Sequence, residues 1–487
     1  MRSTFFAGIV AFAAIIGVTG CGGGGTGLSA PNSIPTSGRS SQGSPIAHVV
    51  MIVQENRSFD NLFALFPGAD GATRGLMKVK SHGNWVDRWQ KLQPHSLIMS
   101  SDIQHCHAAF LTDWDNGKMD GFDLAALGVC PNGTKFAGKV PYQYVQQSDI
   151  QPYWDIADQW VLADHLFQTQ GSGSFTAHQD LIRGGTHITV NESIIDNPRQ
   201  MPWGCDHVGT SKVDPTSLIT NAGKYLKDQG PVPCTNDFPY SGSKYATLAT
   251  LMDAKQVTWK YYSPCFSGWN QNNCDKGCAN TCAGSTLNAF DVIYSVRYGP
   301  EWGTNVSMPE TNIFTDIKNG ALPAMSWVMP EDNEDDHPGE SVDYGPSWVA
   351  SVVNAIGNSP YWKSSVIIVL WDDWGGFYDN AAPPKQNTQG GLGFRVPMLI
   401  ISPYAKMGTS SQGGYVSHTQ YEFGSLMKYI EENFALGSLH TTDTGSNSIG
   451  DTLDYAQARR PFHTIPSQKN IDFFERLPHT VSHGDPQ

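Results

Sequence analysis

Three stretches of the chain are continuously apolar and rich in β-branched residues, and they constrain the fold more than any other feature. They are residues 46–53 (IAHVVMIV), 366–371 (VIIVLW) and 396–402 (VPMLIIS). An uninterrupted apolar run of strand length is typical of a strand that is buried on both faces, as in a parallel sheet covered by helices. Weaker strand candidates are residues 160–163, 257–262 and 324–329.

Helical spacing of apolar residues lies between these strands. Residues 348–356 carry it, and Gly357 predicts the end of that helix. A second helix is predicted over residues 421–434, with Phe423, Leu426 and Ile430 on one face. Strands that alternate with helices predict an α/β fold with a doubly wound, mainly parallel sheet. The 50 glycines and 30 prolines among 487 residues indicate long loops around it.

The N-terminus is typical of an export signal. Arg2 precedes an apolar stretch, residues 5–18, which is too short for a membrane span and ends in Val18-Thr19-Gly20-Cys21. Small residues before a cysteine resemble a bacterial lipobox, in which Cys21 is lipidated and becomes the mature N-terminus. We therefore expect a protein that is lipid-anchored to the bacterial cell envelope, on the periplasmic or surface side, or secreted. The alternative is an ordinary signal peptide with a chance cysteine.

Composition divides the rest of the chain. Residues 22–45 are rich in Gly, Ser, Thr and Pro and predict a flexible tether. The folded domain is expected over residues 46–487. Within it, residues 185–320 hold most of the cysteines and many Gly, Asn and Ser, which favours long insertions or a cap over the sheet.

The cysteines indicate disulfide bonds. Of nine cysteines, eight remain when Cys21 is set aside: Cys106, Cys130, Cys205, Cys234, Cys265, Cys274, Cys278 and Cys282. An even number in an exported chain favours disulfides. The spacing of Cys274, Cys278 and Cys282 also fits a zinc knuckle, but no paired histidine lies nearby.

The net charge bears on the partners of the protein. Its formal value is −14, from 45 acidic and 31 basic residues, which argues against a nucleic-acid partner because phosphate backbones attract clustered Lys and Arg. It does not argue against phosphate chemistry, because a bound cation supplies positive charge locally.

Groups that metal-assisted hydrolysis needs follow four of the predicted strands. These groups are residues 54–60 (QENRSFD), residues 372–379 (DDWGGFYD), the acidic loop ending in Asp335-Asp336-His337-Pro338, and Asp164-His165 followed by Gly171-Ser172-Gly173-Ser174-Phe175. Sites in open α/β sheets form beyond the carboxyl ends of the strands, so we expect these groups to converge.

Each piece also has a purely structural interpretation. Asp372-Asp373 fits a solvated loop, and Ser174 fits the N-cap of a helix. The glycine-flanked serine is neither a Walker motif nor G-x-S-x-G, since Thr176 stands where the last glycine is required. The triplet His105-Cys106-His107 fits a copper or zinc site, but alternation along a strand explains it equally well.

Taken together, the motifs resemble those of the phosphoesterase family of non-specific phospholipases C and acid phosphatases, in the alkaline-phosphatase superfamily. In the order of that family, the chain has Glu55 to Asp60 (ENRSFD), Asp102-Ile103-Gln104-His105, Asn116 to Phe122 (NGKMDGF), Gly173 to Gln179 (GSFTAHQ), Asp335 to Pro338 (DDHP), Asp372 to Asp379 (DDWGGFYD), and Gly393 to Pro397 (GFRVP) followed by Ser402-Pro403-Tyr404 and Ser417-His418-Thr419.

The resemblance implies a parallel α/β sheet of the alkaline-phosphatase type and assigns roles. A divalent metal ion of unknown identity is held by Glu55, Asn56, Ser174, Asp372 and Asp373, whose hard oxygen ligands suit such a cation. Ser174 is the nucleophile, and His105 and His337 flank the site, bind phosphoryl oxygens and protonate the leaving oxygen.

The chain departs from the family pattern in two places. Thr176-Ala177-His178 stands where many members of the family have Pro-Asn-Arg after the nucleophile, and we expect His178 to substitute in part for that arginine. Trp374 stands where a histidine is frequent. We expect phospholipase C-type cleavage of phospholipid headgroups or of other phosphate esters. The alternatives are an acid phosphatase acting on phosphomonoesters and a non-catalytic surface binding lipoprotein.

Overall fold

The structure is a computed structural model of the whole chain. It describes residues 43–133, 135–196, 205, 215–232, 245–265, 287–339, 341–342, 344–384 and 391–478. The predicted signal segment, Cys21 and nearly all of the predicted tether lie outside these ranges. The described residues belong to one compact unit, residues 36–487.

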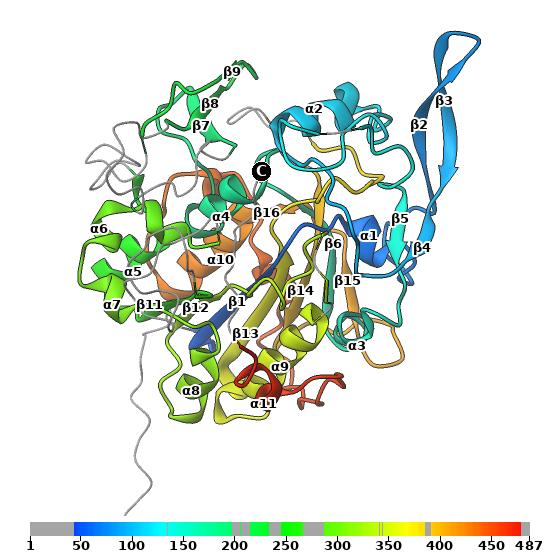
Figure 1. Ribbon diagram of the computed structural model, residues 1–487. Coiled ribbons are helices and arrows are strands. Elements are labelled where there is room, and N and C mark those ends of the chain that lie inside the picture. The colour runs from blue at the N-terminus through cyan, green and yellow to red at the C-terminus, as the bar shows by residue number, and fades with distance from the viewer. Residues whose placement is uncertain are drawn as a thin grey trace, which may run out of the picture. The chain divides into compact units, whose positions relative to one another are not determined.

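A nine-stranded sheet forms the centre of this unit (Figure 1). Its strands are β11 (Val306–Ser307), β10 (Trp259–Tyr262), β12 (Met325–Val328), β1 (His48–Gln54), β13 (Ser365–Trp371), β14 (Arg395–Ile401), β6 (Val161–Phe167) and β15 (Tyr415–Ser417) in spatial order, with β16 (Tyr421–Glu422) also paired to β6. The neighbours of β1 and β10 are parallel to them, and β15 and β16 are parallel to β6. The prediction of a mainly parallel α/β sheet is confirmed.

Strand β14 runs against the others. It is antiparallel to β13 on one side and to β6 on the other. Every residue of β14 is buried, as in β1 and β13. The prediction that the apolar run 396–402 forms a strand buried on both faces is therefore confirmed. A continuous apolar pattern carries no information about strand direction, so the expectation that this run belongs to a parallel arrangement was wrong for β14.

Strand β6 is longer than its apolar pattern predicted. The prediction ended at Ala163, but the strand continues through Asp164 and His165 to Phe167. Asp164 is buried in the strand and accepts hydrogen bonds from both neighbouring histidines, His165 and His418, which satisfies its carboxylate. These two positions therefore lie in the strand and not in a loop after it.

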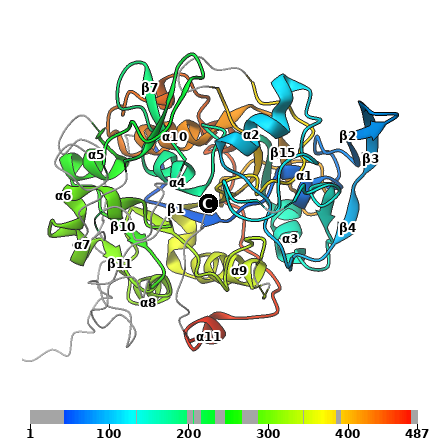
Figure 2. The same ribbon diagram turned by 45° about the horizontal axis from the view of Figure 1, so that its top comes forward.

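Helices cover both faces of the sheet (Figures 1 and 2). On one face, α9 (Gly345–Gly357) packs against α3 (Gln151–Gln159), α8 (Asn312–Lys318) and α11 (Ile471–Phe474). On the other face, α10 (Phe423–Phe434) packs against α4 (Ser174–Arg183). Both predicted helices are present, and α9 begins three residues before the predicted start. No helix in the described ranges is long and apolar enough to cross a bilayer.

The region predicted as insertion or cap, residues 185–320, contributes to two structures. It forms a three-stranded sheet of β7 (Glu192–Ile195), β8 (Ser217–Thr220) and β9 (Tyr225–Leu226), and it supplies β10 and β11 to the central sheet. The helices α5 (Leu248–Lys255), α6 (Tyr294–Arg297) and α7 (Glu301–Thr304) also belong to it.

A disulfide joins Cys106 to Cys130, and Cys205 and Cys265 are disulfide-bonded as well. The disulfide prediction is confirmed for these four cysteines. The remaining four, Cys234, Cys274, Cys278 and Cys282, lie outside the described residues, so the zinc-knuckle alternative stays untested.

Candidate active site

The register of two central strands brings the first four candidate residues together. Gln54 at the end of β1 is paired with Trp371 at the end of β13. Because the strands are parallel, the next residues of each chain segment leave the sheet side by side at its carboxyl edge. These are Glu55 and Asn56 after β1, and Asp372 and Asp373 after β13, all fully buried.

Asn56 connects the two segments. Its φ of 58° lies in the left-handed region, which Asn tolerates better than most residues. In this conformation its backbone N–H donates to Oδ1 of Asp372 at 2.9 Å, and its Nδ2 donates to both oxygens of Asp373 at 3.0 and 3.1 Å. The amide oxygen Oδ1 is left without a hydrogen-bond partner.

Asp373 is further fixed by the backbone that follows it. The N–H of Gly375 donates to its Oδ1 at 2.7 Å. Gly375 has a φ of 59°, and a Cβ there would collide with the carbonyl oxygen of Asn56. The glycine therefore allows the turn after β13 to pack directly on the turn after β1.

Glu55 and Asp372 form the most acidic part of the site. Burial, and then the negative charges of Asp372, Asp335 and Asp373, raise the pKa of Glu55 well above its ordinary value. Oε2 of Glu55 and Oδ2 of Asp372 are buried and accept no hydrogen bond. Buried polar atoms without partners are rare, and here they are carboxylate oxygens that converge from adjacent strands.

His178 belongs to this acidic part, although it is absent from the residues predicted for the site. Its Nε2 lies 3.0 Å from Oε1 of Glu55 and 3.8 Å from Oδ2 of Asp372. It lies one turn after Ser174 on α4, so the same helix supplies both side chains. The sequence suggested a share in phosphate recognition for His178, whereas the structure places it beside the two carboxylates.

Ser174 is the first residue of α4, after Gly173 at the N-cap. The prediction that it caps the helix was one residue off. Its hydroxyl donates to Oδ2 of Asp373 at 3.2 Å and is fully buried. The position at a helix N-terminus places it where the helix dipole favours negative charge.

His105 and His337 lie together at the other side of Asp373. Their ring centroids are 5.9 Å apart, and Nε2 of His105 lies 3.9 Å from Oδ2 of Asp373 and 2.9 Å from Nδ2 of Asn56. Nδ1 of His105 donates to the carbonyl of Ile103 at 2.6 Å, and Nδ1 of His337 donates to the carbonyl of Pro338 at 2.7 Å. In the neutral rings, both Nε2 atoms are therefore the acceptors.

The copper or zinc interpretation of residues 105–107 is not supported. Cys106 is in the disulfide with Cys130 and offers no thiolate. His107 begins α2 (His107–Trp114), and its Nδ1 bonds the carbonyl of Gly171 at 2.7 Å, apart from the contacts of His105.

Other motif residues hold the segments in place. Arg57 is buried and donates to the carbonyl oxygens of Asp336 at 2.7 Å and Leu97 at 2.8 Å, which ties the loop of His337 to the end of β1. Burial lowers the pKa of Arg57 to about 10, so it stays charged at neutral pH. Asp336 accepts from Tyr153 and Trp371, both at 2.9 Å.

Trp374 does not take the place of a histidine in the site. It is fully buried, its Nε1 donates to Oδ2 of Asp113 at 3.1 Å, and its ring lies edge-on to that of His105 with centroids 6.2 Å apart. The Trp374 ring thus gives His105 an apolar neighbour in the interior of the protein.

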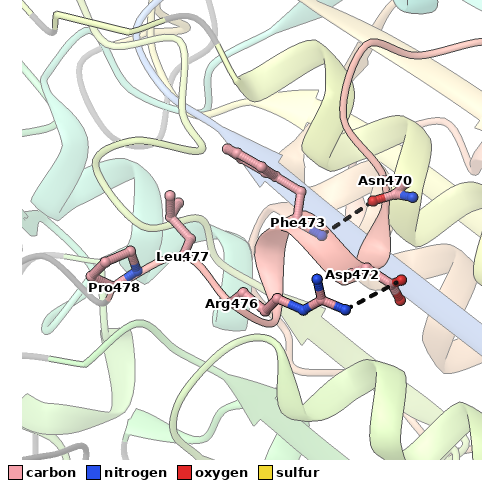
Figure 3. A pocket seen from close by; sticks show the side chains of 6 residues that line it. All are labelled: Asn470, Asp472, Phe473, Arg476, Leu477 and Pro478. Atoms are coloured by element: carbon pink, nitrogen blue, oxygen red, sulfur yellow. Dashed lines mark hydrogen bonds and ion pairs between the residues drawn. The ribbon is translucent and has the colours of Figure 1, made fainter.

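A surface pocket of 480 Å³ lies elsewhere, beside α11. It is lined by Asn470, Asp472, Phe473, Arg476, Leu477 and Pro478 (Figure 3). Asp472 and Arg476 pair with each other at 3.7 Å, and Asn470 caps the helix by accepting from the N–H of Phe473. The pocket contains none of the candidate site residues.

Known proteins are similar to this chain in sequence over most of its length. The chain is 25% identical over 447 residues to a non-hemolytic phospholipase C of Burkholderia pseudomallei. The match covers 82% of this chain and 57% of that protein. It is 23% identical over 487 residues to phospholipase C B of Mycobacterium tuberculosis, covering 90% of this chain and 83% of that one. The chain thus spans little more than half the length of the first relative.

A solved structure of a protein in the alkaline phosphatase superfamily from Vibrio parahaemolyticus shares 10% identity with this chain at a TM-score of 0.33. The match covers 88% of this chain and 78% of that one. The family assignment comes from sequence. The model of the Phosphoesterase family matches residues 46–437, which include all the residues predicted for the site. The resemblance to the phosphoesterase family is confirmed: the chain belongs to the Phosphoesterase family.

Proposed function

We propose that the protein is a metal-dependent phosphoesterase that uses Ser174 as its nucleophile and cleaves phospholipids in the manner of a phospholipase C. One observation carries the proposal. Glu55, Asn56, Asp372, Asp373 and Ser174, which come from three distant parts of the chain, meet at the carboxyl edge of the sheet.

The residues present fit a divalent cation. Three buried oxygens without hydrogen-bond partners, Glu55 Oε2, Asn56 Oδ1 and Asp372 Oδ2, are hard donors of the kind that such cations bind. Burial, and then the nearby negative charges of Asp372, Asp335 and Asp373, raise the pKa of Glu55, and a bound cation would offset the charge gathered there. Glu55, Asn56, Ser174, Asp372 and Asp373 would hold the ion, which when bound would polarise the phosphoryl group.

The chain itself supplies the nucleophile. The hydrogen bond from Ser174 to Asp373 orients Oγ, and the N-terminus of α4 favours negative charge at that atom and at the incoming phosphate. Oγ passes its proton to Oδ2 of Asp373, the acceptor of its hydrogen bond, and attacks phosphorus. The bond to the leaving oxygen breaks and a phosphoseryl group forms, which water then hydrolyses.

His105 and His337 supply the proton. Their positions beside Asp373 and Asn56 place two imidazoles on one side of the attacking oxygen. In the protonated state, an imidazole Nε2–H bonds a phosphoryl oxygen or protonates the leaving alkoxide. The carbonyls of Ile103 and Pro338 fix the rings through Nδ1, so that Nε2 is the working nitrogen of each.

The relatives support the choice of substrate, because two of them are named phospholipase C. A phosphomonoesterase would use the same nucleophile and metal ligands, and the choice of substrate distinguishes the two activities. A non-catalytic binding lipoprotein has no use for buried carboxylates that lack partners, since their burial costs free energy.

We also propose that the protein is exported and anchored through a lipid on Cys21. The proposal rests on the apolar segment 5–18 and on the small residues before Cys21. Mass spectrometry of the native protein should detect an acylated N-terminal cysteine. A mature chain that begins elsewhere, with Cys21 unmodified, would contradict it.

The test of function combines elemental analysis with a substrate panel. Purified full-length protein should contain a stoichiometric divalent metal and release phosphocholine from phosphatidylcholine, and chelation should remove both metal and activity. Hydrolysis of aryl phosphate alone would assign the phosphatase alternative. The absence of hydrolysis of either substrate by metal-loaded protein would contradict the proposed function.

A further inference from the structure

A two-stranded hairpin stands out from the rest of the described unit (Figures 1 and 2). It consists of β2 (Arg74–Ser81) and β3 (Asn84–Lys91), joined by the two-residue turn His82-Gly83. Both turn residues have positive φ, 50° and 85°, as the tight turns of regular hairpins require. All the residues from Asn84 to Trp89 are exposed, although β3 is paired with β2 along its whole length.

The exposed residues include two tryptophans. Trp85 is 50% exposed and Trp89 is 56% exposed, and they are the tryptophans in the exposed class among the described residues. Side chains alternate along a strand, so Trp85 and Trp89 lie on the same face of the hairpin. Val86, 42% exposed, adds apolar surface on the other face.

The same face carries positive charge. The register pairs Lys80 with Trp85 and Arg74 with Lys91, and all four share the face of the tryptophans. The Lys80 ammonium lies 5.1 Å from the Trp85 ring, and the Arg74 guanidinium lies 4.6 Å from the Trp89 ring. These cation–π contacts hold the rings and the charges next to each other.

The charge of the hairpin contrasts with that of the chain. Residues 74–91 contain five cations, Arg74, Lys78, Lys80, Arg88 and Lys91, and one acid, Asp87, whereas the whole chain has a formal charge of −14. Lys78 is paired with Asp120 at 2.5 Å, but the other four cations are exposed. A locally basic, aromatic projection on an acidic protein indicates a partner that is anionic at its surface and apolar beneath.

We propose that the β2–β3 hairpin docks the protein onto the surface of a bilayer that contains anionic phospholipids. Tryptophans prefer the interface between headgroups and acyl chains, and Lys and Arg are attracted to anionic headgroups. The exposed rings of Trp85 and Trp89 enter the interface, while Arg74, Lys80 and Lys91, which share their face, contact the headgroups. The inference deepens the proposed function, because it places a lipid-cleaving site at the surface that holds its substrate.

The root of the hairpin connects docking to the site. Met77 is buried in one apolar cluster with Trp374 and Tyr378, which belong to the segment that carries Asp372 and Asp373. A Cβ on Gly75 would collide with the ring of Tyr378, so β2 packs directly on that segment. The hairpin is therefore anchored on the wall of the candidate site, and docking through it sets the orientation of the site toward the membrane.

The test measures vesicle binding without turnover. The full chain carrying Cys21→Ser, to prevent acylation, and Ser174→Ala is sedimented with vesicles of phosphatidylcholine alone or with phosphatidylglycerol. Binding should favour the anionic vesicles and weaken with added salt. Trp85→Ala with Trp89→Ala should weaken it at least tenfold, and each of Arg74→Gln, Lys80→Gln and Lys91→Gln should reduce the preference for anionic lipid by roughly fivefold.

The matched control is Met407→Ala, which removes a side chain that is 64% exposed and lies after β14, at the sheet edge opposite the candidate site. It should bind like the parent. With Ser174 restored, the tryptophan variant should cleave a soluble phosphodiester at the parental rate, which shows that it is folded, but should lose activity on vesicles.

Two results would overturn the docking proposal: undiminished vesicle binding by the tryptophan variant, or dependence on Trp85 and Trp89 for binding an acidic polysaccharide or protein but not vesicles. Failure of the proposed function is distinct, because it would abolish hydrolysis of every phosphate ester by the metal-loaded parent while leaving vesicle binding measurable.

Discussion

The hydroxyl of Ser174 lies 3.2 Å from Oδ2 of Asp373, although 199 positions separate the two residues in the sequence. The contact joins the N-terminus of α4 to the turn after β13. In the proposed roles, the nucleophile and a metal ligand are in direct contact, and replacing each of them should impair the enzyme in a different way.

Replacement of Ser174 by alanine removes the covalent route and leaves the carboxylates in place. We expect kcat to fall by on the order of 10³-fold or more, with metal content unchanged. Ser172→Ala is the matched control, because the Ser172 hydroxyl is also buried but bonds Asp196 at 2.9 Å. If Ser174→Ala keeps more than about a tenth of kcat, a difference of only ~1.4 kcal/mol, then water attacks directly and Ser174 is not the nucleophile.

Replacement of Asp373 by asparagine should act through the metal. The variant keeps the size of the side chain but loses its charge, so we expect metal content to fall and added metal to restore part of the rate. Elemental analysis of dialysed protein, beside a titration of activity with metal, measures both effects. An inactive variant with full metal content would assign Asp373 to another role.

His178 should hold the proposed metal ligand Glu55 in position. Its Nε2 lies 3.0 Å from Oε1 of Glu55, which orients that carboxylate. We expect His178→Ala to weaken metal affinity by roughly 10–100-fold, as is typical for groups that hold a ligand in place. His178→Gln, which retains a donor, should recover part of the affinity. A competition assay with a chelating dye measures it, and unchanged affinity in the alanine variant would refute the supporting role.

Much of this arrangement was predictable because it depends on local patterns. The apolar runs of β1 and β13 located the centre of the sheet, and the rule that sites form at carboxyl edges located Glu55, Asn56, Asp372 and Asp373. The pairing of Gln54 with Trp371, which sets these residues side by side, follows from the adjacency of two parallel strands, and the sequence contained no signal for that adjacency.

Other features depend on contacts that no local pattern encodes. The reversed direction of β14 is invisible in its burial pattern. In the sequence, His178 stands out only as a departure from a family motif. Its spacing of four residues from Ser174 on one helix is the signal that both side chains face the same site. The β2–β3 hairpin has alternating residues and a glycine-containing turn, which are hairpin signals that were not recognised.

Arg395 forms a buried ion-pair network with Asp60 and Asp379, and this network gives the family motifs a role in stability. Its Nε lies 3.0 Å from Asp379, and its Nη2 lies 3.5 Å from Asp60. Arg395→Met leaves two buried carboxylates without their cation, which should lower the free energy of unfolding by about 3–5 kcal/mol at neutral pH. Arg395→Lys should fall between, since it keeps the charge but not the planar set of donors.

The pH dependence distinguishes this cause from a simple packing defect. Burial, and then the charge of the neighbouring Asp379, raise the pKa of Asp60, so protonation at mildly acidic pH relieves the unpaired charge in the variant. Urea unfolding should therefore show a smaller loss for Arg395→Met at pH 5 than at pH 7.5. An equal loss at both pH values would indicate that packing, not charge, dominates.

Glu431 on α10 offers a test of electrostatics away from the site. Its carboxylate accepts from the N–H of Leu439 at 2.7 Å and is otherwise buried. Burial is the main cause that raises its pKa to about 8, and the negative charge of Asp443 adds to it. A folded-state pKa above the unfolded value of 4.5 means that the native state prefers the protonated acid. The contribution of Glu431 to stability is thus fully present below about pH 4.5 and is lost as the pH rises through about 8.

Glu431→Gln replaces the acid with a neutral side chain that still accepts from Leu439. The melting temperature of the variant, relative to the parent, should be nearly unchanged at pH 5, rise between pH 5 and 8, and level off above that range. Glu432→Gln, at the exposed neighbouring position, is the control and should show no such rise. Thermal unfolding across this pH range measures the difference. A variant that gains most at acidic pH would reverse the sign and show that the ionised Glu431 stabilises the native state.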